Sequence, residues 1–128
     1  MAALLIVDDD ETVRDALYEL FEEAHRCHLA GTAEQAMDWL ETEEYDVVLT
    51  DISMPGLSGV ELLASLRQRR SYTPVIIISG LGDEGHARGL MDMGAFDYLV
   101  KPFRLEAVEA SVRRALDHRR RLSKEDRK

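Results

Sequence analysis

The side chains best suited to chemistry in this sequence are three consecutive aspartates at 8–10, a fourth at Asp51, the hydroxyl of Ser79 and the ammonium of Lys101. Clustered carboxylates repel one another unless a cation lies among them. Hard oxygen ligands with open positions suit Mg2+, which is commonly held by one or two carboxylates and a phosphate. A carboxylate can attack phosphorus to form an aspartyl-phosphate, while a lysine and a hydroxyl stabilise charge on the transferred oxygens. The residue types therefore indicate Mg2+-dependent phosphoryl chemistry, provided that the fold brings them together.

Five short apolar runs are predicted to be β-strands. Two of them, at 47–49 and 75–78, are continuously apolar, which is typical of strands buried on both faces of a parallel sheet. The predicted strands are Ala3 to Val7, Cys27 to Ala30, Asp46 to Thr50, Pro74 to Ser79 and Phe96 to Val100.

Segments of helical period separate and follow these strands. Apolar residues recur at helical spacing in five stretches, which lie at about 13–21, 33–40, 59–66, 87–91 and 105–116. Asp10 has the place of an N-cap for the first helix. Thr32 with Gln35, and Ser58 with Glu61, have the spacing of capping boxes. Residues 54–57 (Met-Pro-Gly-Leu) have the sequence of a turn.

Strict alternation of strands and helices favours an α/β domain with a mostly parallel sheet and right-handed crossovers. In such a sheet, ligands bind outside the carboxyl ends of the strands. Residues 8–10 follow the first predicted strand, Asp51 the third and Lys101 the fifth, and Ser79 ends the fourth. The sequence therefore predicts that these side chains converge at one edge of the sheet.

Four stretches of the chain resemble the motifs of response-regulator receiver domains, in the same order. They are Leu5-Ile6-Val7-Asp8-Asp9-Asp10, Asp51-Ile52-Ser53-Met54-Pro55-Gly56, Ser79-Gly80 and Tyr98-Leu99-Val100-Lys101-Pro102-Phe103. The resemblance spans residues 3–117. It implies a flavodoxin-like, doubly wound fold with five helices and a five-stranded parallel sheet of order 2-1-3-4-5. We expect a receiver domain over residues 1–118, followed at 119–128 by the start of a linker or simply the end of the chain.

The resemblance also implies a role for each site residue. Asp51 would accept a phosphoryl group from a histidine kinase or a phosphotransfer protein. Asp9 and Asp51 would bind Mg2+ directly, the main-chain carbonyl of Ser53 would add a ligand, and Asp8 would act mainly through water. Ser79 would donate a hydrogen bond to the phosphoryl group, and Lys101 would form an ion pair with it. Tyr98 would change rotamer on activation. The bond between Lys101 and Pro102 matches a peptide that is cis in the family.

Signal output is expected from the face formed by the fourth helix, fifth strand and fifth helix. This face carries charges of both signs, which could pair across a two-fold axis. They are Arg88, Asp92, Asp97 and Arg113, to which Arg114 and Asp117 are candidate additions. We expect activation to favour a homodimer through this face; a monomer that only exposes a docking surface is the alternative.

Five glycines crowd the fourth strand-helix segment: Gly80, Gly82, Gly85, Gly89 and Gly94. A glycine inside a helix costs about 1 kcal/mol relative to alanine. We therefore predict that the fourth helix is the least stable one, which suits a switching element.

Three other functions compete with a phosphorylated receiver. A haloacid dehalogenase-type enzyme also uses an aspartate nucleophile and Mg2+, but it needs a second aspartate where this chain has Ser53. A flavin binder would place a phosphate beside Asp8, which would repel it. A receiver-like scaffold that never accepts phosphate usually lacks some of the site residues that are present here.

Composition argues against nucleic acids and membranes as partners. The 128 residues carry 25 acidic and 16 basic side chains, a net charge of -9, and phosphate contacts need clustered Lys and Arg. Because the one basic cluster, at 118–121, resembles a solvated helix end, we expect no direct binding to nucleic acid. No apolar run approaches the ~20 residues of a membrane span, and we expect a cytoplasmic protein. Cys27 is expected to be a buried small hydrophobe.

Overall fold

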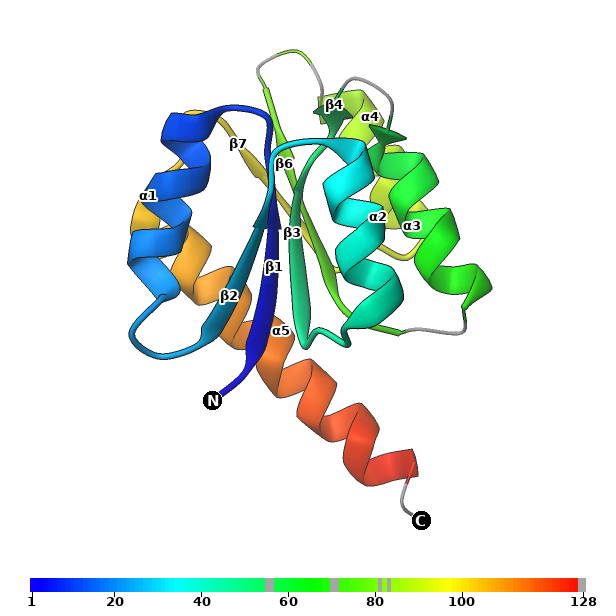
Figure 1. The fold of residues 1–128 in the computed structure, drawn as a ribbon. Helices are drawn as coiled ribbons and strands as arrows, with labels where there is room; N and C mark the ends of the chain where they lie inside the picture. The colour runs from blue at the N-terminus through cyan, green and yellow to red at the C-terminus, as the bar shows by residue number, and fades with distance from the viewer. Residues whose placement is uncertain (55–56, 70–71, 81, 83, 127–128) are drawn as a thin grey trace.

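A parallel sheet forms the centre of the structure, a computed structural model that describes residues 1–54, 57–69, 72–80, 82 and 84–126, with side chains described except at 53–60, 84 and 122–126. The sheet order is β2-β1-β3-β6-β7 and all neighbours are parallel (Figure 1). Its strands are β1 (Ala3–Val7), β2 (Arg26–Ala30), β3 (Val47–Asp51), β6 (Val75–Ser79) and β7 (Asp97–Val100). The predicted order 2-1-3-4-5 is confirmed, and each strand begins and ends within one residue of its prediction.

Helices cover both faces of this sheet. They are α1 (Glu11–Phe21), α2 (Ala33–Thr42), α3 (Gly59–Gln68), α4 (Glu84–Asp92) and α5 (Leu105–Asp126). Figure 1 shows α1 and α5 on one face and α2, α3 and α4 on the other. Alternate strand residues face opposite layers, so Leu4 and Ile6 of β1 pack with α1 and α5, whereas Leu5 and Val7 pack with the other three helices. All four are fully buried, and so are the apolar runs 47–49 and 75–78, for which burial on both faces was predicted.

The predicted N-caps of two helices, α1 and α2, are confirmed. Asp10 Oδ1 accepts hydrogen bonds from the amides of Thr12 at 2.9 Å and Val13 at 3.4 Å. Thr32 Oγ1 accepts from the Gln35 amide at 3.1 Å. The third signal involves Ser58, whose side chain lies outside the described residues.

The sequence missed a small hairpin after β3. The strands β4 (Ser53–Met54) and β5 (Leu57–Ser58) pair antiparallel, on either side of the predicted turn. The two central turn residues, 55 and 56, lie outside the described residues. The hairpin joins the carboxyl end of β3 to α3, so it borders the predicted site.

The last helix continues beyond its expected end. We predicted a linker or chain end from Arg119, whereas α5 runs on to Asp126 and extends past the lower edge of the sheet in Figure 1. Part of this extension is tied to the domain, because Arg119 Nε lies 3.9 Å from Asp46 Oδ1. A domain boundary at residue 118 stays a prediction. Within the described residues, none of the helices has the length and hydrophobicity that crossing a membrane requires.

Candidate functional site

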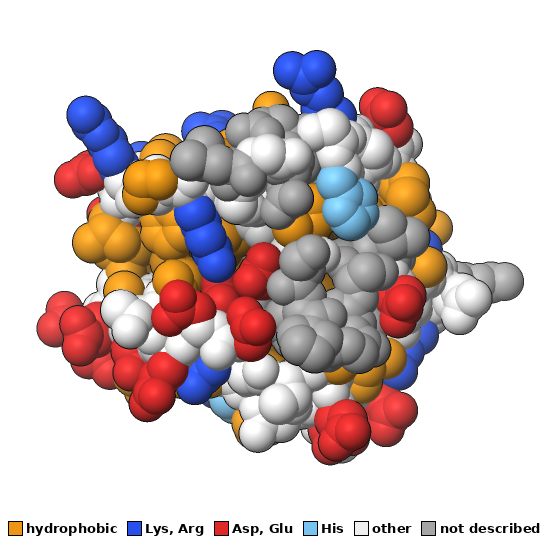
Figure 2. All heavy atoms as spheres, turned by 90° about the horizontal axis from the view of Figure 1, so that it is seen from above, with side chains coloured by type: hydrophobic (Ala, Val, Ile, Leu, Met, Phe, Trp, Pro, Cys, Tyr) orange, Lys and Arg blue, Asp and Glu red, His pale blue; other side chains and the backbone are white. Residues whose placement is uncertain are grey.

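The predicted site residues gather at the carboxyl ends of the strands. Asp8 and Asp9 directly follow β1, Asp51 ends β3, Ser79 ends β6 and Lys101 directly follows β7. Parallel strands place these ends at the same edge, which lies at the top of Figure 1. Figure 2 looks down on this edge and shows acidic side chains gathered near its centre beside a basic one.

Three carboxylates form the acidic cluster, which consists of Asp8, Asp9 and Asp51. One carboxylate oxygen of each lies within 4.8 Å of the others. Asp8 is fully buried and Asp51 is 9 % exposed, whereas Asp9 is open to solvent. A ligand can therefore reach Asp51 and Asp9 from the surface while Asp8 forms the floor of the site.

Lys101 brings a positive charge to the cluster. Its Nζ lies 3.2 Å from Asp8 Oδ2 and 3.5 Å from Asp51 Oδ2. Burial alone would lower the pKa of Lys101, but the carboxylates of Asp8 and Asp51 outweigh it and raise the pKa above its usual value. One ammonium faces three carboxylates, so the cluster keeps a net negative charge that favours a further cation.

Asp8 provides the clearest sign that a cation belongs here. Its Oδ1 accepts a 2.9 Å hydrogen bond from the amide of Asp10. Its Oδ2 is buried, and in the described part of the chain it receives no well-aligned hydrogen bond, although it forms an ion pair with the Lys101 ammonium at 3.2 Å. A buried carboxylate oxygen is costly without full compensation. An all-oxygen donor set at the surface fits Mg2+, which keeps several waters.

The remaining predicted residues lie at or near the same edge. Ser79 is fully buried, and the one hydrogen-bond contact of its side chain within the described residues is a long one, 3.5 Å from Oγ to the carbonyl of Leu99. Tyr98 is half-buried and packs against the α2–α3–α4 layer. Ser53 begins the hairpin that follows β3. The Lys101-Pro102 peptide is cis, as the resemblance implied.

Sequence reasoning missed one residue beside the cluster. The Nη1 of Arg14 in α1 donates a 2.9 Å hydrogen bond to the main-chain carbonyl of Asp8. Arg14 follows the aspartates by one helical turn, so its spacing was a signal, but only the fold shows what it contacts.

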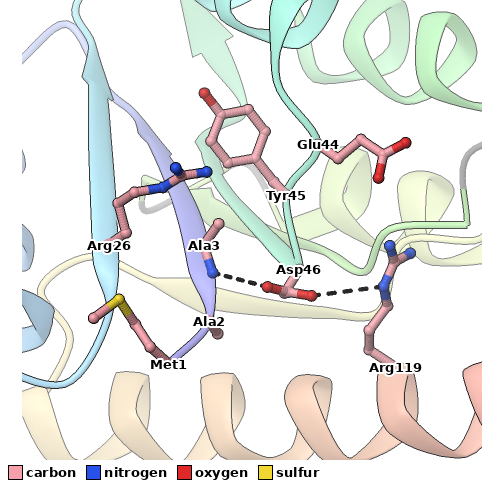
Figure 3. A pocket seen from close by; sticks show the side chains of 8 residues that line it. All are labelled: Met1, Ala2, Ala3, Arg26, Glu44, Tyr45, Asp46 and Arg119. Atoms are coloured by element: carbon pink, nitrogen blue, oxygen red, sulfur yellow. Dashed lines mark hydrogen bonds and ion pairs between the residues drawn. The ribbon is translucent and has the colours of Figure 1, made fainter.

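A hollow of about 350 Å3 lies at the opposite edge of the sheet, next to Arg119 of α5 (Figure 3). The Asp46 carboxylate points into it and is shared: Oδ2 accepts from the Ala3 amide at 2.8 Å, and Oδ1 faces Arg119 Nε at 3.9 Å. Arg26 is 3.6 Å from Glu43. Three of the charged residues that line the hollow, Arg26, Asp46 and Arg119, thus have partners of opposite charge, which is typical of a structural contact rather than a site for a reacting group.

Comparisons with known proteins agree with this geometry. Residues 4–113 match the family described as response regulator receiver domain. The chain is 40 % identical over 114 residues to the DNA-binding transcriptional regulator NtrC of Klebsiella pneumoniae, a match that covers 88 % of this chain and 24 % of that protein. It is 39 % identical to the C4-dicarboxylate transport transcriptional regulatory protein DctD of Pseudomonas aeruginosa, over 91 % of this chain and 26 % of that protein. The chain thus spans about a quarter of the length of these curated relatives.

Solved structures show the same fold. A response regulator receiver domain protein from Clostridium thermocellum superposes with a TM-score of 0.89 at 30 % identity, covering 95 % of this chain and 99 % of that one. Full-length FixJ from B. japonicum gives a TM-score of 0.89 at 32 % identity, covering 96 % of this chain and 61 % of that one.

Proposed function

The chain belongs to the response regulator receiver domain family, the signalling domains that accept phosphate in two-component systems, and we propose that Asp51 is its phosphoacceptor. The supporting observation is the contact of Asp51 with both kinds of group that this reaction needs. Its carboxylate lies within 4.8 Å of those of Asp8 and Asp9, and its Oδ2 is 3.5 Å from the Lys101 ammonium. At 9 % exposure, Asp51 remains accessible at an open edge of the sheet.

The acidic cluster would hold one Mg2+ ion. Asp9 and Asp51 would bind it directly, the carbonyl of Ser53 would add a ligand, and Asp8 would act through water. When bound, Mg2+ would neutralise the carboxylates and draw charge from the phosphoryl oxygens. The buried Oδ2 of Asp8 has the Lys101 ammonium 3.2 Å away but no well-aligned hydrogen bond within the described residues, which supports this assignment.

The proposed reaction moves a phosphoryl group from a phosphohistidine to Asp51. A carboxylate oxygen of Asp51 attacks phosphorus as the phosphorus–nitrogen bond breaks, and the imidazole takes up a proton as it leaves. Lys101 would pair with the transferred phosphoryl oxygens, because its ammonium already faces the Asp51 carboxylate. The Ser79 hydroxyl would donate to another of these oxygens. The donor would be a sensor histidine kinase or a phosphotransfer protein.

An intact-mass measurement tests the assignment of Asp51. Incubation with acetyl phosphate and Mg2+ is expected to add one phosphoryl mass to the wild type and none to Asp51→Asn. The control Asp15→Asn, on the exposed surface of α1, keeps the adduct. An adduct of equal yield on Asp51→Asn would contradict the assignment, and a wild type that takes up no phosphoryl group would favour a receiver-like scaffold.

Phosphorylation would reach the surface through Ser79 and Tyr98. Movement of Ser79 toward the phosphoryl group would free space for the Tyr98 ring to turn inward. Tyr98 lies on β7, so this change would alter the face formed by α4, β7 and α5. We expect that face to form a symmetric dimer after activation, which then controls an output.

Three of the charges expected at this dimer face, Asp97, Arg114 and Asp117, are engaged within the chain. Asp97 Oδ2 accepts from Ser111 Oγ at 2.7 Å and from Arg114 Nη2 at 2.9 Å. Another candidate, Asp117, lies 3.7 Å from Arg120. The exposed charges that remain for contacts between copies are Arg88, Asp92 and Arg113.

Light scattering tests the dimer. The chain is expected to be a monomer alone and a dimer with beryllofluoride and Mg2+, and Arg113→Glu is expected to weaken the dimer by placing an acid where a base was. A wild type that stays monomeric in both conditions, well above micromolar concentration, would favour the alternative of an exposed docking surface.

A further inference from the structure

The side chain of Arg14 links α1 to the end of β1. Arg14 is half-buried in the first turns of α1, and its Nη1 donates to the main-chain carbonyl of Asp8 at 2.9 Å. No ion pair joins Arg14 to a carboxylate among the described residues. Its contact with the site is therefore with the backbone that carries the aspartates, and not with their charges.

The carbonyl of Asp8 needs a donor from outside the sheet. The pairing of β1 with both of its neighbours ends at Val7, and the Asp8 amide makes the last contact, with Ala30 O at 3.0 Å. Asp8 is fully buried, where an unpaired main-chain oxygen is destabilising. A guanidinium donates a charge-assisted bond and stays protonated at any working pH, so Arg14 can hold this oxygen permanently.

Gly31 leaves the space that Arg14 occupies. A Cβ at this position would lie 2.6 Å from Arg14 Nη1 and 3.2 Å from its Cζ. The backbone of Gly31 does not adopt the left-handed conformation that Gly82 and Gly94 adopt. The space that Gly31 leaves for the guanidinium, rather than its backbone angles, is therefore what this glycine contributes. The Arg14 guanidinium thus lies between the first turns of α1 and the turn that joins β2 to α2.

The held carbonyl belongs to the peptide that joins Asp8 to Asp9. Asp8 Oδ1 accepts from the amide of Asp10 at 2.9 Å, so the side chain of Asp8 fixes the next peptide along the chain. Between them, these two bonds orient the backbone on both sides of Asp9, whose own exposed side chain has no hydrogen bond or ion pair among the described residues. The direction in which the Asp9 carboxylate leaves the chain therefore depends on Arg14.

We propose that Arg14 is a positioning residue for the Mg2+ site, held in place by the absence of a side chain at Gly31. This inference rests on the proposed function, because it concerns how Asp8 and Asp9 are presented to the metal ion. Groups one contact away from metal ligands commonly change metal affinity or activity by 10- to 100-fold when removed.

The test compares two substitutions that displace the guanidinium by independent routes. Arg14→Gln removes it, and Gly31→Ala pushes it aside while leaving the arginine present. Each has a matched control. Arg69→Gln removes another arginine that donates to a main-chain carbonyl, that of Leu40 at 2.8 Å, far from the cluster. Gly89→Ala adds a methyl group where nothing lies within 4 Å.

Mg2+ affinity is measured by calorimetry on the metal-free proteins without a phosphodonor, and the Mg2+ dependence of phosphorylation by acetyl phosphate is measured beside it. Arg14→Gln and Gly31→Ala are each expected to weaken Mg2+ binding about tenfold. Arg14→Lys, which keeps one charged donor, is expected to fall between them and the wild type. Both controls stay within twofold of the wild type. A purely structural role would lower the melting temperature without changing the Mg2+ affinity of the folded protein.

Folded Arg14→Gln and Gly31→Ala proteins that bind Mg2+ within twofold of the wild type would overturn the inference, while phosphorylation of the wild type would leave the proposed function intact. If Arg14→Gln does not fold, Gly31→Ala and Arg14→Lys decide on the same criterion. A wild type that does not bind Mg2+ would overturn the proposed function and this inference together.

Discussion

Aspartate carboxylates are compensated differently at the two edges of the sheet. At the carboxyl edge, Asp8 and Asp51 share one ammonium, and the buried Asp8 Oδ2 receives no well-aligned hydrogen bond from any described residue. At the amino edge, Asp46 is bound on both oxygens, by the Ala3 amide and by Arg119 (Figure 3). The residue type is the same at both edges, so the degree of charge compensation is what distinguishes the candidate metal site from a structural contact.

The largest effect is expected from removing the single cation of the acidic cluster. Lys101→Met leaves the buried Asp8 carboxylate without a counter-charge. Breaking a buried ion pair costs about 3–5 kcal/mol, and partial solvation of the Lys101 ammonium reduces the expected loss to about 2–3 kcal/mol. Because Mg2+ binds only the folded form and would replace the lost charge, it should stabilise Lys101→Met more than the wild type.

Urea denaturation with EDTA and with Mg2+ measures both effects. Arg119→Gln is the control at the amino edge, where the pair is longer and more exposed. It should cost less than about 0.5 kcal/mol, with no change in the response to Mg2+. A Lys101→Met protein as stable as the wild type in EDTA would mean that the two edges do not differ as described.

Neutralising one aspartate at each edge should change stability in opposite directions. Asp9→Asn relieves repulsion within the acidic cluster, so it should stabilise the metal-free protein by about 0.5 kcal/mol and weaken Mg2+ binding. Asp46→Asn weakens two favourable contacts and should destabilise by about 1 kcal/mol.

The pair is measured side by side in EDTA, with Asp15→Asn on the exposed surface of α1 as the control for loss of a negative charge. The same sign for Asp9→Asn and Asp46→Asn would show that the net charge of the protein, and not the local compensation, governs both results.

The residues of the carboxyl edge could be predicted from the sequence because they depend only on where each strand ends. Apolar runs fixed the strands, and the polar residue that ends or follows each strand must lie at that edge in a parallel sheet. This places Asp8, Asp51 and Lys101 together before any contact is known. Their resemblance to receiver motifs added the strand order, which patterning alone leaves open.

Contacts between helices and turns could not be predicted in this way. The place of Arg14 beside Gly31 depends on how α1 packs over the turn after β2, and the bonds of Asp97 depend on which side of α5 faces β7. The apolar stripe fades from about Arg119 onward, which predicted that α5 ends there. Helix-favouring residues and the Asp117–Arg120 pair, three residues apart, support its continuation instead.

The predicted low stability of α4 is supported only in part by its glycines. Gly85 and Gly89 are inside the helix, and no described residue lies within 4 Å of a Cβ added at either position, so no close approach to these residues explains them. Gly82 and Gly94 have φ angles of 95° and 108°, which explains them as turn residues. The structure therefore separates the two kinds of glycine, and low stability of α4 stays a prediction.

The smallest effect concerns pH at the amino edge. His25 Nδ1 accepts a 3.2 Å hydrogen bond from the Ala2 amide, which requires this nitrogen to be unprotonated. Burial lowers the pKa of His25 below 6.5, and the N-terminal ammonium and Arg120 lower it further, against an opposing effect of Asp46.

Because the folded pKa is below the unfolded one, the unfolded chain binds the proton more readily. The contribution of His25 to stability is therefore full above about pH 6.5 and is lost as the pH falls through that value toward the folded pKa. His25→Gln keeps an acceptor for the Ala2 amide but does not titrate, so its free energy of unfolding should fall less than that of the wild type between pH 7.5 and about pH 5.

Urea denaturation across this range measures the difference, with His86→Gln on the exposed surface of α4 as the control for loss of a histidine. Parallel pH profiles for the wild type and His25→Gln would show that this contact does not depend on an unprotonated ring.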